Sequence, residues 1–173
     1  MTLSCKDRLF LVGPMGAGKS SIGKSLALVT ERPFLDVDEE IVKYAQMSIP
    51  EIFENSGESA FRDIETEVLK RCISFDAVIA TGGGIVGREE NRRILAQSGV
   101  VVYLYADVET QYQRTLHDNN RPMIATDDRR ARLESIFKVR DPLYRECSDF
   151  IVPSSEMIIR DCVEMIKAKL KEI

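Results

Sequence analysis

The amino-acid sequence predicts an α/β fold in which a parallel sheet is flanked by helices. Five short apolar runs rich in β-forming residues alternate with longer stretches of helical periodicity. A glycine-rich stretch, residues 13–20, separates the first apolar run from the first helical stretch and marks a sharp turn between them. The expected strands are residues 9–12, 34–37, 77–80, 100–105 and 150–152.

The helical stretches complete this alternating pattern. The last one is clearly amphipathic, because Cys162, Val163 and Ile166 recur with Ile158, Ile159 and Leu170 at helical spacing. In a parallel sheet built this way, ligands bind at the carboxyl ends of the strands. The expected helices are residues 18–30, 38–46, 49–54, 58–73, 88–97, 107–117, 129–146 and 156–172.

Composition restricts the class of protein. The 173 residues suit one domain, and 44% hydrophobic with 30% charged residues is typical of globular proteins. A net charge of −4 and a pI near 5.2 argue against a nucleic-acid partner. The four scattered cysteines and the single histidine suggest neither a disulfide framework nor a zinc site. With no signal peptide or membrane-length apolar run, we expect a cytoplasmic protein without a membrane partner.

Residues 13–20 carry the most specific motif, Gly-Pro-Met-Gly-Ala-Gly-Lys-Ser, which matches G-x-x-x-x-G-K-S. Glycines let successive backbone N–H groups turn toward phosphate oxygens, and the N-terminus of the following helix favours anions. Lys19 supplies a mobile charge for the β- and γ-phosphates, and the Ser20 hydroxyl is placed to bind Mg²⁺. A simple capping turn needs no Lys-Ser pair, so the motif favours binding of a nucleoside triphosphate.

Asp36 and Asp38 lie at the end of the second expected strand. A spacing of two residues predicts that both side chains point to the same side of that strand. At this edge of the sheet a carboxylate can hold the waters of Mg²⁺ or accept a proton. The alternative is a pair of solvated loop carboxylates, but the position after an apolar strand favours a functional role.

Three consecutive glycines, residues 82–84, follow the third expected strand. Their conformational cost indicates that the backbone approaches something closely there. Gly82, Gly84 and Gly87 also match G-x-G-x-x-G, the dinucleotide-binding pattern. This second interpretation is weaker, because the pattern lies in mid-chain and one small domain has little room for two nucleotide sites.

Two arginines are candidates for binding an anionic substrate. Arg62 lies one helical turn before Glu65, which could orient its guanidinium group, and Arg140 precedes Asp-Pro-Leu-Tyr. An arginine binds a carboxylate or phosphate through two parallel hydrogen bonds. Spacing alone does not distinguish these two from the other arginines, which are more often solvated surface charges.

Residues 118–128 form a polar stretch without periodicity between two expected helices. A connection of this length in a compact domain is often a mobile functional loop. The alternative is an ordinary surface loop.

Taken together, six segments resemble the shikimate kinase family in order and over nearly the whole chain. They are Gly-Pro-Met-Gly-Ala-Gly-Lys-Ser (13–20), Asp-Val-Asp (36–38), Gly-Glu-Ser-Ala-Phe-Arg (57–62), Thr-Gly-Gly-Gly (81–84), Arg-Pro (121–122) and Arg-Asp-Pro-Leu-Tyr (140–144). The resemblance implies a five-stranded parallel sheet of the P-loop, nucleoside monophosphate kinase-like type, in one domain over residues 1–173. It also implies transfer of the γ-phosphoryl group of ATP to the 3-hydroxyl of shikimate, a step of aromatic amino acid biosynthesis.

The same resemblance implies roles for individual residues. A substrate-binding subregion is expected at about 38–65 and a lid at about 118–128, in a monomer that uses Mg²⁺ with ATP. The nucleotide contacts are then Gly13, Gly16, Ala17, Gly18, Lys19, Ser20, Ser21, Arg114 and Arg121. The shikimate contacts are Asp38, Arg62, Gly83, Gly84 and Arg140. The Mg²⁺ contacts are Ser20 and, through water, Asp36, and the catalytic residues are Lys19, Asp38 and Arg121.

Other functions remain as alternatives. A P-loop sugar-acid kinase such as a gluconate kinase would share the motif at residues 13–20. The shikimate interpretation differs from it because it requires Arg62 and Arg140. A nucleotide switch is poorly supported, because no Asp in the chain has Gly three residues later and Asn-Lys-x-Asp is absent. A dinucleotide-binding module would rest on residues 82–87 alone.

The first prediction concerns Arg121 in the expected lid. If the lid brings Arg121 to the phosphates only when both substrates are bound, Arg121→Ala should lower kcat more than it raises the KM for shikimate. Amide hydrogen exchange across residues 118–128 should slow when a non-hydrolysable ATP analogue and shikimate are added together, because closure excludes water. Equal exchange with and without ligands would show that the segment is a static connection.

Overall fold

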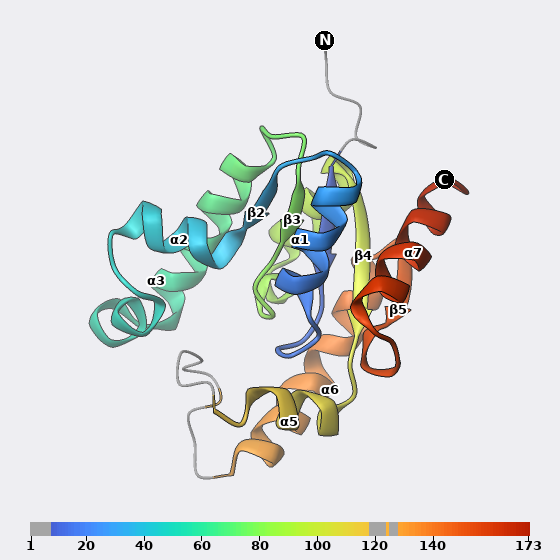
Figure 1. The fold of residues 1–173 in the computed structure, drawn as a ribbon. Coiled ribbons are helices and arrows are strands. Elements are labelled where there is room, and N and C mark those ends of the chain that lie inside the picture. The colour runs from blue at the N-terminus through green and yellow to red at the C-terminus, as the bar shows by residue number, and fades with distance from the viewer. Residues whose placement is uncertain (1–7, 118–123, 125–127) are drawn as a thin grey trace.

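A computed structural model describes residues 8–117, 124 and 128–173. Its centre is a five-stranded sheet, all parallel, in the order β2-β3-β1-β4-β5 (Figure 1). The predicted α/β class and all five predicted strands are therefore confirmed. The strands are β1 Leu9–Val12, β2 Phe34–Asp36, β3 Val78–Ala80, β4 Val100–Tyr105 and β5 Phe150–Pro153.

Helices cover both faces of the sheet. One face packs against α1 and α7, and the other packs mainly against α2, α3, α4 and α6 (Figure 1). Helix α5 packs on α6 near the carboxyl ends of the strands. The bounds are α1 Lys19–Val29, α2 Val37–Ala45, α3 Ile49–Cys72, η2 Ile85–Gly87, α4 Glu89–Ser98, α5 Val108–Thr115, α6 Arg129–Cys147, η4 Ser154–Glu156 and α7 Ile159–Leu170.

The central strands are apolar on both sides because both faces are covered. In β1, Leu9 and Leu11 pack in the core under α1 and α7, whereas Phe10 and Val12 pack in the core under α2, α3, α4 and α6. All four side chains are fully buried. This explains why the sequence of β1 is a continuous apolar run rather than an alternating one.

The strand order places a topological switch point at β1. The chain crosses from β1 to β2 and returns to β3 on one side, and then crosses to β4 on the other side. Ligands of open parallel sheets bind at such a point, outside the carboxyl ends of the strands. Residues 13–20 follow β1, residues 36–38 begin at the last residue of β2, and residues 81–84 follow β3, so all three motif segments meet at this edge.

Helix α3 consists of two helical segments that meet at Gly57. The first segment begins with a capping box, in which Ser48 and Glu51 bond each other's backbone N–H groups. Gly57 has φ 82° and ψ 173°, a conformation that is not helical. This break agrees with the two separate helices predicted for residues 49–54 and 58–73, and Arg62 lies on the second segment.

One local prediction was wrong. Strand β2 ends at Asp36, and α2 begins at Val37, so Asp36 and Asp38 do not share a face of one strand. Asp36 is the N-cap of α2, where its Oδ1 accepts a hydrogen bond from the Asp38 backbone N–H at 2.9 Å. The capping preference of aspartate ends the strand earlier than apolar periodicity alone suggests.

Two further observations bear on the sequence predictions. The described cysteines, Cys72, Cys147 and Cys162, are buried free thiols, and Cys5 lies outside the described residues. Across the described part of the chain, every helix is too short or too polar to cross a membrane.

Candidate active site

The loop after β1 has the backbone of a phosphate cradle. Gly13, Gly16 and Gly18 all have positive φ, at 149°, 79° and 87°, which glycine adopts without strain. Gly18 is the N-cap of α1 and offers no side chain to the first backbone N–H groups of the helix. Those N–H groups are therefore open to an anion, whose charge the helix dipole also favours.

Lys19 lies over this loop. Its Nζ donates hydrogen bonds to the carbonyl oxygens of Gly13 at 2.7 Å and of Pro14 at 2.9 Å. These bonds hold the ammonium group at the mouth of the cradle, where it can meet a phosphate.

Ser20 and Asp36 bring two hard oxygen donors together beside the loop. The Ser20 hydroxyl donates a hydrogen bond to Asp36 Oδ2 at 2.7 Å, although the residues lie on α1 and at the end of β2. The described residues contain no cluster of three or more His, Cys, Asp or Glu suited to a metal ion. A Mg²⁺ ion here would therefore take its remaining ligands from phosphate and water, as Mg²⁺ commonly does in nucleotide sites.

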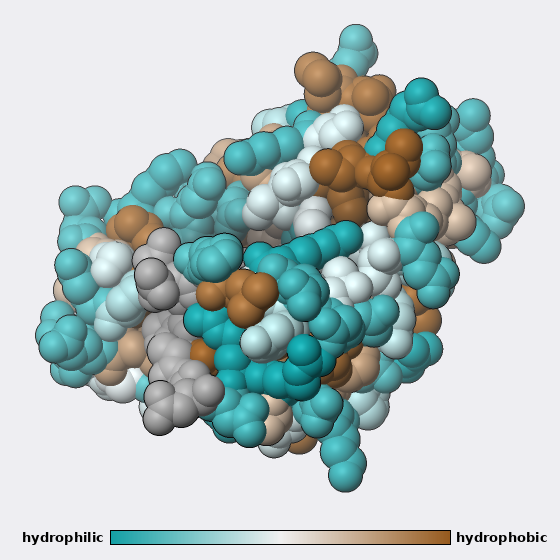
Figure 2. Space-filling model, turned by 60° about the horizontal axis from the view of Figure 1, so that its bottom comes forward, coloured by the Kyte–Doolittle hydropathy of each residue, from teal (hydrophilic) through white to brown (hydrophobic). Residues whose placement is uncertain are grey.

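A polar cavity of about 120 Å³ joins these groups to the loop after β3. The surface at this edge, seen when the bottom of Figure 1 is brought forward, is largely hydrophilic (Figure 2). Asp38 reaches the cavity from the first turn of α2. The lining residues are Gly16, Lys19, Ser20, Ser21, Asp36, Asp38, Thr81, Gly82 and Gly83.

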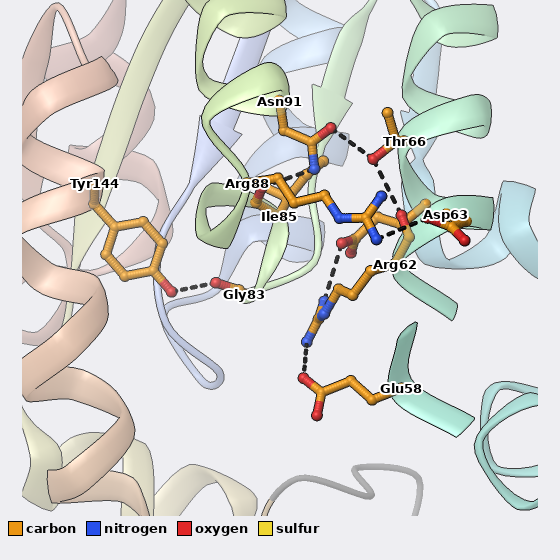
Figure 3. Close-up of polar contacts among 10 residues, drawn as sticks. Glu58, Arg62, Asp63, Thr66, Gly83, Ile85, Arg88, Asn91 and Tyr144 are labelled. Carbon is orange, nitrogen blue, oxygen red and sulfur yellow. Dashed lines mark hydrogen bonds and ion pairs between the residues drawn. The ribbon is translucent and has the colours of Figure 1, made fainter. Parts of the chain in front are cut away.

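Arg62 approaches this loop from α3. Its guanidinium group lies directly against Gly84, where a Cβ would be only 2.5 Å from Nη1 and 2.6 Å from Cζ. The group is ion-paired with Glu65 at 3.0 Å and with Glu58 at 3.5 Å (Figure 3). The expectation that Glu65 orients Arg62 therefore agrees with the structure, and a side chain at Gly84 would displace the guanidinium group from its present position.

Arg140 approaches the same loop from α6. An added Cβ at Gly83 would meet Arg140 Nη1 at 3.5 Å and the Tyr144 hydroxyl at 3.6 Å. Tyr144 is fully buried, accepts a hydrogen bond from Arg140 and donates one to the Gly83 carbonyl oxygen at 2.5 Å (Figure 3). Burial lowers the pKa of Arg140, and the nearby positive charge of Arg62 lowers it further. The guanidinium groups of Arg62 and Arg140 thus lie at adjacent glycines and form a site that an anion would stabilise.

Glu65 is a buried carboxyl group between these charges. It is 1% exposed, and burial raises its pKa to about 7, with Arg62 opposing the rise and Asp38 adding to it. Its Oε2 is buried and without a hydrogen-bond partner among the described residues. This carboxyl group is consequently poised to exchange a proton near neutral pH.

The remaining predicted residues divide into two groups. Arg114 donates a hydrogen bond to the Gly16 carbonyl oxygen at 2.8 Å, which places its guanidinium group beside the loop after β1. Ala17 is buried there, and its carbonyl oxygen lies 2.7 Å from the Ser154 hydroxyl. Arg121 and the expected lid, apart from residues 124 and 128, lie outside the described residues.

Three comparisons with known proteins agree on one family. A model of the family "Shikimate kinase" matches residues 15–171. The shikimate kinase of Thioalkalivibrio sulfidiphilus is 47% identical over 92% of this chain and 85% of its own length. A solved shikimate kinase of Acinetobacter baumannii, in complex with shikimate, superimposes with a TM-score of 0.93 at 43% identity, over 95% of this chain and 93% of the other. The chain belongs to the shikimate kinase family.

A gluconokinase of Sinorhizobium meliloti bears on the main alternative. It superimposes with a TM-score of 0.58 at 15% identity, over 95% of this chain and 91% of its own. That likeness shows a shared kinase fold alone. The sugar-acid kinase alternative is consequently less supported than membership of the shikimate kinase family.

Several residues of the site were missed by sequence reasoning. Tyr144 falls within a quoted motif, and its position one helical turn after Arg140 was the available signal. Ser154 gave no local signal, because its partner Ala17 lies 137 residues away. Thr66 and Asn91, whose side chains are hydrogen-bonded to each other, also gave no local signal in the sequence.

The second prediction concerns the pH dependence of stability. Because the pKa of Glu65 is raised in the folded state, the neutral form favours folding below about pH 4.5, and that contribution is lost as pH rises through about 7. The free energy of unfolding of the wild type should therefore fall relative to Glu65→Gln between pH 5 and pH 8, by up to about 3 kcal/mol. Urea unfolding at each pH measures this difference.

The control for this prediction is Glu67→Gln, which removes an exposed carboxylate of the same helix. It should leave the pH dependence of the wild type in place. A constant difference between the wild type and Glu65→Gln across this range would show that Glu65 ionises normally.

Proposed function

We propose that this chain transfers the γ-phosphoryl group of ATP to the 3-hydroxyl of shikimate. The observation that carries the proposal is the pair of guanidinium groups of Arg62 and Arg140 at one glycine turn, which adjoins the phosphate loop through a polar cavity. A small substrate that carries a carboxylate and hydroxyl groups fits this arrangement. The family membership of the chain points to the same reaction.

The substrate side of the site would bind shikimate at both ends. Arg62 and Arg140 would hold the carboxylate by paired, charge-assisted hydrogen bonds. Asp38 lies where it could accept hydrogen bonds from ring hydroxyls, since it reaches both the cavity and the edge of Gly82. The backbone of Gly83 and Gly84 would line the space between these groups.

The nucleotide side would hold the phosphates of ATP. The N–H groups of residues 13–20 and Lys19 would contact the phosphates, and Arg114 would lie toward the adenine. Ser20 would hold Mg²⁺ directly and Asp36 through water, a donor pair that suits this hard cation. Mg²⁺ supplies neutralisation of the phosphate charge when it is bound.

The transfer itself requires mostly positioning and charge stabilisation. Lys19 lies close to where negative charge develops, and Arg121 is proposed to join it from the lid. Asp38 is first a positioning group for the attacking hydroxyl, because a loose transition state makes little demand on a base. All of these groups belong to one chain, so we propose a monomer as the working unit.

A phosphotransfer assay tests this function directly. The protein is supplied with MgATP and, separately, with shikimate, quinate, gluconate and nucleoside monophosphates, and ADP release is followed. Shikimate should be the best acceptor. Equal or faster turnover of gluconate or of a nucleotide would overturn the proposal.

The third prediction concerns Lys19. The Lys19→Met variant should lose roughly a hundredfold or more in kcat, because it lacks a charge that stabilises the transition state. Its circular dichroism spectrum should be unchanged.

The fourth prediction separates the two halves of the site. Arg62→Lys and Arg140→Lys keep the positive charge but lose the planar fork, so each should weaken shikimate binding by roughly tenfold to a hundredfold. ATP affinity should change little, and calorimetry with each ligand alone measures both. Arg93→Lys, on the exposed face of α4, is the matched control. Equal losses for shikimate and ATP would place these arginines in the scaffold or on the nucleotide side.

A further inference from the structure

A chain of buried hydrogen bonds connects the two elements that carry the proposed shikimate site. Arg62 lies on α3, and the glycines lie in the turn that leads from β3 into η2. These elements are joined through a third, α4, by the side chains of Thr66 and Asn91 (Figure 3). Neither side chain lines the polar cavity or contributes to the arginine pair.

The hydrogen bonds run without interruption from α3 to η2. The Thr66 hydroxyl lies 3.1 Å from the Arg62 carbonyl oxygen and 2.9 Å from Asn91 Oδ1, and its single proton is shared between these acceptors. Asn91 Nδ2 donates to the Ile85 carbonyl oxygen at 2.9 Å. Thr66 is 5% exposed, and Asn91 is fully buried. A broken link would leave a polar atom unpaired away from water, which is costly.

Arg62 stands at both ends of this path. The hydrogen bonds from its backbone carbonyl oxygen through Thr66 and Asn91 to Ile85 are called the relay below. Its guanidinium group lies against Gly84, the residue before Ile85. Because the guanidinium already fills the space of a Cβ at Gly84, a small shift of η2 relative to α3 would either drive the two groups into each other or separate them.

Further contacts fasten the same turn. Arg92 Nη1 donates to the Val86 carbonyl oxygen at 2.8 Å, so two successive carbonyl groups of η2 are held by successive side chains of α4. The ion pair of Arg88 with Asp63, at 2.7 Å, joins the end of η2 to α3 at the surface (Figure 3). The buried relay is the more constraining of the two connections to α3, because exposed ion pairs contribute little.

We propose that Thr66 and Asn91 are positioning residues, which set the spacing between Arg62 and the glycine turn and thereby the affinity for the substrate carboxylate. This inference rests on the proposed function, because it takes shikimate as the ligand. The hydrogen bonds of Thr66 and Asn91 reach Arg62 and Ile85 and none of residues 13–20, so we expect these two residues to act mainly on binding of the acceptor substrate rather than of ATP.

Isosteric variants test the relay. Thr66→Val removes the hydroxyl but keeps the shape, and Asn91→Leu removes both polar links. Each should raise the Kd for shikimate about three- to thirtyfold while the Kd for ATP changes less than about twofold. Thr66→Ser keeps the hydroxyl and should restore shikimate affinity. The matched control is Thr30→Val, since Thr30 also bonds a carbonyl one turn back, that of Leu26, but lies at the far end of α1.

A double variant tests whether the two residues act as one unit. The combined Thr66→Val and Asn91→Leu change should weaken shikimate binding about as much as the more severe single change. Either single change already interrupts the connection between α3 and η2, so the second change has little left to remove. Should Asn91→Leu fail to fold, the comparison of Thr66→Val with Thr66→Ser still shows whether the Thr66 hydroxyl sets the affinity for shikimate.

The outcomes separate this inference from the proposed function. Unchanged shikimate affinity in folded Thr66→Val, or equal losses for shikimate and ATP, would overturn the positioning role while the wild type still binds shikimate. Strictly additive losses in the double variant would overturn the relay. A wild type that does not bind shikimate would overturn the proposed function itself.

Discussion

The parallel alignment of β3, β1 and β2 is the constraint on which the candidate site depends. Because these strands run in one direction, their carboxyl ends meet at one edge, and each is followed there by polar or glycine-rich residues. The phosphate loop follows β1, Asp36 is the last residue of β2, and Gly82 follows closely after β3. The apolar side chains that bury β1 on both faces thus determine where the polar residues after it are placed.

The site also depends on the balance of charge among Arg62, Arg140 and Glu65. Arg62 and Arg140 lie at adjacent glycines of one turn, and among the described residues Glu65 is the one carboxyl group that is deeply buried near them. Because burial raises the pKa of Glu65 to about 7, its negative charge is only partly available near neutral pH. An anionic ligand would therefore add compensation for the charges of Arg62 and Arg140.

Sequence patterns predicted the fold and the motifs that line the candidate site, because both are local. The five strands follow from apolar runs, and Lys19 and Ser20 follow from a motif of eight residues. The position of Asp38 was wrong in detail, since Asp36 caps a helix where strand periodicity was expected to continue. Tyr144, Ser154 and the Thr66–Asn91 pair were not predicted. Their partners lie between 25 and 137 residues away, and only the packing of α3, α4, α6 and β5 brings them together.

The backbone conformation at Gly57 restricts which hand of amino acid could replace the glycine. A Cβ added at Gly57 would meet nothing within 4 Å, so packing does not select glycine there. The φ of 82° and ψ of 173° lie in a region that glycine alone occupies among the natural residues. A mirror-image residue has the opposite preference, so D-alanine would fit where L-alanine is excluded. The path of the chain from Ser48 to Arg62 thus requires a residue without L-chirality at a position where there is ample room for a side chain.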